Sequence, residues 1–180
     1  MQEQILKPRV NLTSLGVEDV RELLSKGWMT HDAMWFLHST AEVGIHRTNE
    51  INHAAVRSMG LVEVKRIKRL LGVERVTTPE QLEEFVRSAS ALIKPRFMKY
   101  ELSFPEPGVL RWRWEDEQCF AYQGIRSLGL LDEYRCGIYV RVEAWLEGLH
   151  LPFTMTPDTR CCVMHKNGRC ERTFRVRFPA

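Results

Sequence analysis

Five polar side chains recur at helical spacing between residues 38 and 53 and could carry chemistry: His38, Glu42, His46, Asn49 and His53. At 100° per residue these positions fall within an arc of about 80°, so we call them the polar stripe. Glu42 lies four residues from both His38 and His46, and a carboxylate–imidazole pair can bind a metal, transfer a proton or anchor a ligand. The stripe borders the apolar face of its helix. We therefore expect its first and middle parts to form a pocket wall and His53 to lie on the surface.

The residue types in and beside the polar stripe suggest which of them could be catalytic and which could bind a ligand. Glu42 and His46 are the candidate catalytic residues, while Asn49, His38 and the nearby aromatic Trp35 are candidate ligand-binding residues. The competing interpretation is a polar boundary that local hydrogen bonds satisfy.

A second candidate site lies in the last 62 residues of the chain, which hold all five cysteines. Soft ligands on both arms of a predicted hairpin, together with two further thiols, could bind a transition metal such as zinc or iron. The candidate ligands are Cys119, Cys136, Cys162, His165 and Cys170. The spacing is not that of a standard zinc motif, so small buried core thiols are the alternative. An odd number of cysteines without an export signal predicts reduced thiols.

Two basic surfaces define an alternative of another class, a non-catalytic module that binds protein or nucleic acid. One is the basic helix expected over residues 62–71, and the other is an arginine-rich face of the predicted strands. On the strands the tryptophans share the opposite face and cannot stack bases beside the arginines, so nucleic acid is not an expected partner. The basic strand residues are Lys99, Arg111, Arg113, Arg175 and Arg177.

The chain lacks a phosphate-binding glycine loop, a G-x-S-x-G nucleophile elbow and an H-E-x-x-H sequence. Kinase, serine hydrolase and standard zinc protease activities are therefore excluded as interpretations.

Periodicity predicts the elements that must position these residues. Helices are expected over 17–26, 31–59, 62–71 and 79–93, with Gly27 and Gly60 as stops and a capping box at the start of the last one. A hairpin over 97–114 has one apolar face, two helical segments follow, and strands over 151–164 and 170–178 end the chain. This order predicts a single α+β domain over residues 1–180, with a helical arm (1–95) and an antiparallel sheet with helices (96–180).

Composition bounds the rest. The 180 residues are 44% hydrophobic with a net charge of +3, which is ordinary for a soluble globular protein. No apolar run approaches the roughly 18 residues of a membrane span, and the first residues lack the pattern of a signal peptide. We expect a cytoplasmic protein without a membrane partner.

The pattern resembles a family of small bacterial and archaeal cytosolic proteins of unknown function over about residues 28–140. The resemblance rests on two motifs, D..WF…E.G…N on the long helix and C..Q..R..GL…C later, seen here from Asp32 to Asn49 and from Cys119 to Cys136. More distantly, the ending from Gly168 is similar to L-2-amino-thiazoline-4-carboxylic acid hydrolase-like proteins and to vinyl-reductase-type ligand-binding domains.

Together these features favour a cytosolic small-molecule or metal-binding protein, including a hydrolase-type enzyme, with a pocket lined by the helix over 31–59. The expected partner is a small-molecule ligand. Self-association as a homo-oligomer is left open by the sequence.

Overall fold

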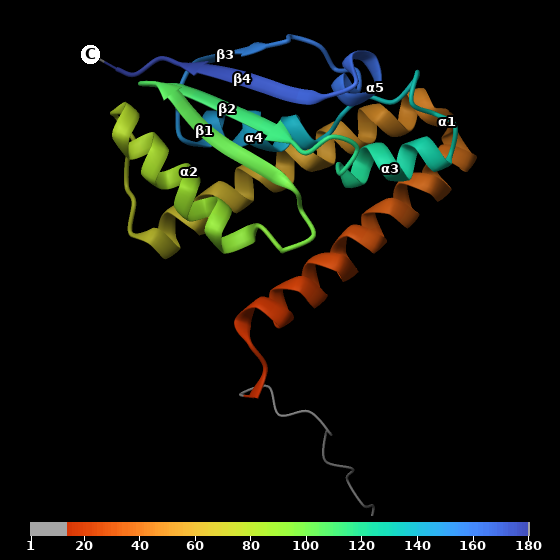
Figure 1. Cartoon of the computed structure of the whole chain (residues 1–180), viewed down its shortest axis with the longest axis horizontal. Helices are drawn as coiled ribbons and strands as arrows, with labels where there is room; N and C mark the ends of the chain where they lie inside the picture. Colours follow the sequence, from red (N-terminus) through yellow and green to blue (C-terminus); the bar gives the residue numbers. More distant parts are fainter. Residues whose placement is uncertain (1–13, 180) are drawn as a thin grey trace, which may run out of the picture.

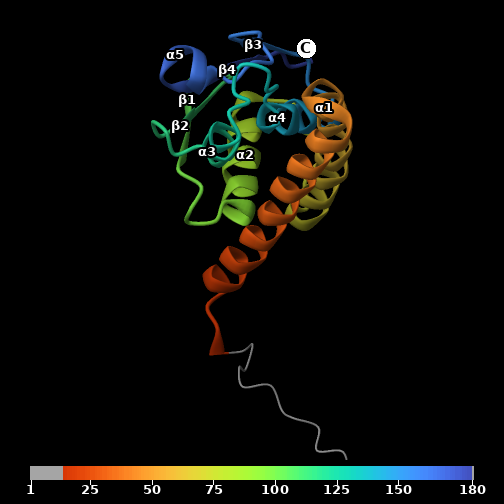
Figure 2. The same ribbon diagram turned by 90° about the vertical axis from the view of Figure 1, so that its right-hand side faces the viewer.

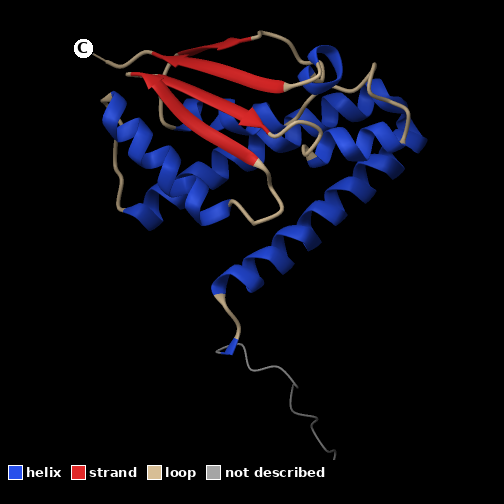
Figure 3. Cartoon of the chain, viewed as in Figure 1, coloured by secondary structure: helices blue, strands red, loops and turns tan. Residues whose placement is uncertain are grey.

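A computed structural model describes residues 14–179 and shows an α+β fold, as the sequence predicts (Figure 1; Figure 3). Residues 1–13 and 180 of the predicted domain lie outside the described residues. The helices are α1 (Val17–Leu71), α2 (Pro79–Ile93), α3 (Phe120–Ser127), α4 (Ile138–Gly148) and α5 (Val163–Asn167). The strands are β1 (Tyr100–Glu106), β2 (Val109–Trp114), β3 (Phe153–Thr156) and β4 (Cys170–Val176).

One 55-residue helix, α1, replaces the three helices predicted over residues 17–71. It bends at Gly44, whose φ of 76° and ψ of 160° are not helical. Only glycine adopts this backbone region readily, because it has no Cβ. Gly44 therefore divides α1 into an N-terminal half (residues 17–43) and a C-terminal half (residues 45–71).

The predicted helix stops at Gly27 and Gly60 are wrong, since both glycines lie inside α1. Gly60 instead allows close packing against α4, because a Cβ there would lie 2.8 Å from the Cβ of Ala144. Glycine at a helix contact can thus mark the closest approach of two helices rather than the end of one.

The start of α2 is as predicted. Thr78 caps the helix by accepting a hydrogen bond from the Gln81 amide at 3.3 Å, with Pro79 in the first turn. The Gln81 side chain in turn accepts from the Thr77 amide at 2.8 Å, so the capping residues satisfy donors at this end of the helix.

The four strands form one antiparallel sheet in the order β1-β2-β4-β3. The predicted hairpin over 97–114 is confirmed as β1 and β2. The predicted strand over 151–164 is wrong beyond Thr156, because Pro157 has no N–H to donate to the strand ladder and residues 163–167 form α5.

The core lies on one face of this sheet, where α4 is held between the sheet and the C-terminal half of α1 (Figure 2). Tyr100, Trp112 and Trp114 are buried on this face, as the alternation of the hairpin predicts. The opposite face is open to solvent. None of the helices within residues 14–179 is both long and apolar enough to span a membrane.

Candidate functional site

A large open cleft separates the N-terminal half of α1 from the rest of the protein. That half projects from the body (Figure 1), and the cleft beside it has a volume of about 1580 Å³. The facing wall is built from the C-terminal half of α1, the end of α2, the β1–β2 hairpin, α3 and α4. The cleft is thus formed by elements that lie far apart in the sequence.

The walls of this cleft are mainly apolar. Most of the large apolar side chains that stay exposed among residues 14–179 line it, from both sides: Leu15, Val17, Leu24, Trp28, Met34, Val62, Leu92 and Leu128. Trp28 is 59% exposed, which is a large apolar surface to leave in water. Contiguous exposed apolar surface of this kind marks sites of ligand or partner binding.

Polar contacts hold the first turns of α1 against the connection between α2 and β1. The Arg96 amide donates to Glu22 Oε2 and its guanidinium to Asp19 Oδ1, both at 2.9 Å. Arg21 donates to the carbonyl of Ala91. The N-terminal half is therefore tied to the body at both of its ends, with the cleft between the two attachments.

One charged cluster in the facing wall is internally neutralised. Arg141 Nε donates to Glu63 Oε2 at 2.7 Å, and the Trp145 indole donates to the same oxygen at 2.8 Å. A second Arg141 nitrogen contacts the other carboxylate oxygen, so the pair is bidentate. The Glu63–Arg141 pair therefore gives this part of the wall polar groups without a net charge.

The polar stripe does not form the cleft wall, which corrects the prediction made for it. His38 and Glu42 are exposed on the N-terminal half of α1, and neither they nor Trp35 line the cleft. His46 is also exposed, with its Nε2 3.6 Å from Glu133 Oε2. The candidate catalytic pair Glu42 and His46 therefore lies on open surface rather than in a pocket.

Asn49 is fully buried and binds backbone instead of a ligand. Its Nδ2 donates to the Glu133 carbonyl at 2.8 Å, and its Oδ1 accepts from the Arg135 amide at 3.0 Å. His53, predicted to lie on the surface, is half-buried, with Nε2 3.2 Å from the Arg135 carbonyl. Both residues position the segment that leads into α4.

The bend at Gly44 also divides the polar stripe. A helical wheel assumes a straight axis and constant rotation, and one non-helical residue changes both. Residues 38 and 42 before the bend and 49 and 53 after it therefore no longer share one face. The cleft is lined by part of the helix predicted over 31–59, through Asp32, Phe36, Val56 and others, but not through the face that carries the polar stripe.

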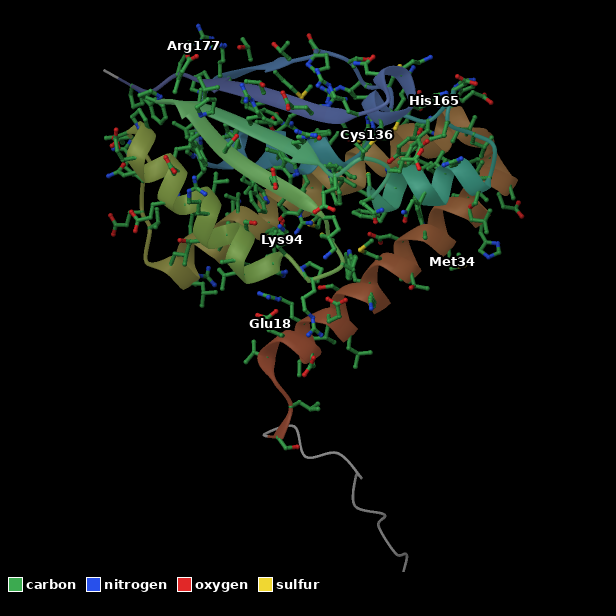
Figure 4. The ribbon with its side chains drawn as sticks, viewed as in Figure 1. Glu18, Met34, Lys94, Cys136, His165 and Arg177 are labelled. Atoms are coloured by element: carbon green, nitrogen blue, oxygen red, sulfur yellow. The ribbon has the colours of Figure 1, made fainter. Side chains whose placement is uncertain are left out.

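Four of the five predicted metal ligands lie near one another in the core, but the fifth, His165, lies apart from them. Cys119, Cys136, Cys162 and Cys170 are buried, whereas His165 lies on α5 near the surface with Nε2 3.0 Å from Asp132 Oδ1 (Figure 4). Within residues 14–179, no group of three or more His, Cys, Asp or Glu side chains is placed to hold a metal ion.

The five cysteines are free. Burial raises the pKa of Cys136 to about 12 and also raises the pKa values of Cys119, Cys162 and Cys170. Tyr139 lies 3.2 Å from Cys170 Sγ through its hydroxyl oxygen. A protonated thiol is a poor nucleophile, and these buried side chains contribute to the packing of the core.

The basic face of the sheet is solvated and partly neutralised. Arg175 lies 3.2 Å from Glu106, and Arg111 lies 3.7 Å from Glu171. The buried tryptophans are on the other face, so this surface offers no aromatic platform for bases.

Sequence reasoning missed Trp28, and it placed Arg66 only in the basic helix over 62–71; both residues line the cleft. A signal was present for the first, since Val17, Val20, Leu24 and Trp28 recur at spacings of three and four residues. The predicted short helix over 17–26 contained the first three of these residues, and its predicted stop at Gly27 left Trp28 outside it.

The fold and site thus define an α+β protein with an apolar cleft beside a bent helix. A model of a family of unknown function (DUF6125) matches residues 13–92, which include α1 and most of α2. The match covers less than half of the chain and leaves out the sheet and the cysteines. No curated protein and no solved structure matches the chain. The more distant similarity to hydrolase-like and vinyl-reductase-type proteins stays a prediction.

Proposed function

We propose that this protein binds a small molecule with a largely apolar body in the cleft between the N-terminal half of α1 and the body. The observation that carries the proposal is the gathering of exposed large apolar side chains on both walls of this one cleft. Covering such a side chain is favourable by about 1.5–3 kcal/mol, so a ligand that bridges the walls removes a large unfavourable exposure.

The composition of the lining supports a small-molecule ligand. Binding sites of this kind are mostly apolar, with a few polar groups that orient the ligand. Here the apolar walls include Trp28, Met34 and Val62, and the polar groups include the neutralised Glu63–Arg141 pair.

A matched pair of tryptophans on the same half of α1 gives the test. Trp28 and Trp35 are 59% and 39% exposed, and only Trp28 lines the cleft. The neutral dye Nile red would be titrated by fluorescence, with decan-1-ol as a competitor. We expect Trp28→Ala to weaken decan-1-ol binding about tenfold, the equivalent of about 1.4 kcal/mol. Trp35→Ala should leave it within about twofold.

Absence of saturable, competed binding in the wild type would contradict the proposal, and so would equal losses in the two variants. A second copy of the chain is the other occupant to test. Light scattering over a range of protein concentrations would detect it, and a stable dimer that excludes Nile red would show that self-association fills the cleft.

The remaining sequence predictions are not needed for this function. A catalytic role for Glu42 and His46, a hydrolase-type reaction and a zinc or iron cofactor stay predictions, and binding in the cleft requires none of them. Cytoplasmic location also stays a prediction, which the five free cysteines support.

A further inference from the structure

The charges that line the cleft leave one cation without a partner. Arg21 contacts Glu18, and Arg141 forms the bidentate pair with Glu63. Arg66 also lines the cleft, but it forms no ion pair or hydrogen bond with another residue in the described part of the chain. The remaining carboxylate of the lining, Asp32, lies on the opposite wall beside His31, at 3.7 Å.

The position of Arg66 separates it from the other cations of this helix. Lys68 and Arg69 lie in the last turn of α1, where positive charge is favoured by the helix dipole. Arg66 precedes that turn, so the helix dipole does not account for a positive charge at this position. Its exposed side chain lies on the cleft side, whereas Lys65 and Arg69 do not line the cleft.

An apolar path leads along α1 to this guanidinium. Met59, Val62 and Arg66 follow one another at spacings of three and four residues, so they share one face of the helix. All three line the cleft. An arginine in such a place lays its aliphatic stem on the apolar wall and keeps its charge at the edge.

We infer that the ligand is an amphiphile with a single negative charge, a medium- or long-chain carboxylate whose head group binds Arg66 and whose chain lies along Met59 and Val62. This inference rests on the proposed function and adds the chemical class of the ligand. One unpaired guanidinium matches one carboxylate in charge and in its two-pronged hydrogen-bonding geometry.

Decanoate and decan-1-ol have chains of equal length and differ in their head groups, which are charged in decanoate and neutral in decan-1-ol. A comparison of their affinities therefore isolates the contribution of the charge. Arg66→Gln removes the charge and keeps most of the stem, while Arg69→Gln is the matched control from the same helix outside the cleft. Binding of each compound would be measured by competition with Nile red. We expect Arg66→Gln to weaken decanoate binding at least about tenfold, since charge-assisted hydrogen bonds are the strong ones. Its decan-1-ol binding, and both affinities of Arg69→Gln, should stay within about twofold of wild type.

The outcomes distinguish the two proposals. Wild type that binds neither compound contradicts the proposed function itself. Wild type that binds both, with decanoate affinity unchanged in Arg66→Gln or equally reduced in Arg69→Gln, overturns only the assignment of the head group. Decyl phosphate bound in preference to decanoate would likewise overturn the carboxylate. Unchanged thermal unfolding of the unliganded variants verifies that the substitutions at these exposed positions leave the fold intact.

Discussion

Asn49 joins the C-terminal half of α1 to the segment before α4 through two backbone hydrogen bonds at a fully buried position. A carboxamide can do this because it donates and accepts at once, and neither charge nor metal is involved. Both ends of its carboxamide are hydrogen-bonded to the backbone, so this side chain stabilises the fold rather than binding a ligand.

Asn49→Ala should therefore destabilise the protein by about 2–4 kcal/mol, because it removes a fully buried side chain and leaves a part-buried carbonyl and a part-buried amide without their partner. Denaturant unfolding measures this loss. Glu42→Gln is the comparison, since an exposed substitution of this kind changes stability by no more than about 0.5 kcal/mol. A loss at Asn49 below that of an ordinary surface change would mean that the two backbone bonds are not formed.

His53 gives a pH dependence whose sign is fixed by its surroundings. Burial lowers its pKa below the ordinary value of 6.5, and the nearby cations Arg160 and Arg135 lower it further, against the Glu143 carboxylate. The unfolded chain thus binds a proton at a higher pH than the folded protein does. The contribution of His53 to stability is present above about pH 6.5 and decreases as the pH falls from there toward its folded pKa.

We expect His53→Gln to lose less stability than wild type between pH 7.5 and 5.5. Urea unfolding at the two pH values measures the difference, and the comparison of slopes cancels the groups common to both proteins. An identical pH dependence of wild type and variant would show that His53 is solvated in the folded state.

At the scale of elements, the bend at Gly44 divides α1 into two segments that both contribute residues to the cleft. Gly44 has space around it, with no atom within 4 Å of an added Cβ, so only its backbone conformation restricts the residue type. Gly27 lies in the same helix with equally free surroundings and an ordinary φ.

Gly44→Ala should destabilise the protein by about 1–3 kcal/mol, the cost of a glycine-only backbone region for a residue with a Cβ. Gly27→Ala should instead stabilise it by about 0.5–1 kcal/mol, because alanine is the better helix former. Thermal and urea unfolding of the two variants measure whether each substitution raises or lowers the stability. Stabilisation at both positions would mean that α1 is regular through residue 44.

At the scale of the whole molecule, the N-terminal half of α1 is attached at its two ends and packs less than the rest. Its first turns are held by exposed ion pairs, which contribute about 0–1 kcal/mol each. By contrast, α4 is buried between the sheet and the C-terminal half of α1. The N-terminal half should therefore open locally at a lower free energy than the body.

Hydrogen exchange should show faster exchange of amides in residues 20–36 than in α4. Saturation with decan-1-ol should slow exchange in residues 20–36 more than in α4, because a ligand that bridges the cleft must be released before this half can open. Equal protection of the two segments without ligand would show that the N-terminal half is as firmly packed as the body.

Elements whose signals are local along the chain could be predicted from the sequence. The capping box at Thr78 and Gln81 located the start of α2, and the alternation around Trp112 located the hairpin and its buried face. Length and order of these elements were enough for the α+β class. Such features depend on residues that are neighbours along the chain or across one turn, so periodicity detects them.

The position of the cleft depends on packing between elements that are distant in the sequence. The bend at Gly44 divides the polar stripe between two helix segments, which a helical wheel drawn for a straight helix does not represent. Likewise, the exposure of Trp28 and the unpaired state of Arg66 depend on what packs opposite them, from elements up to a hundred residues away in the chain. A side chain is functional or structural according to its partners in space, and those partners are set by packing rather than by local sequence.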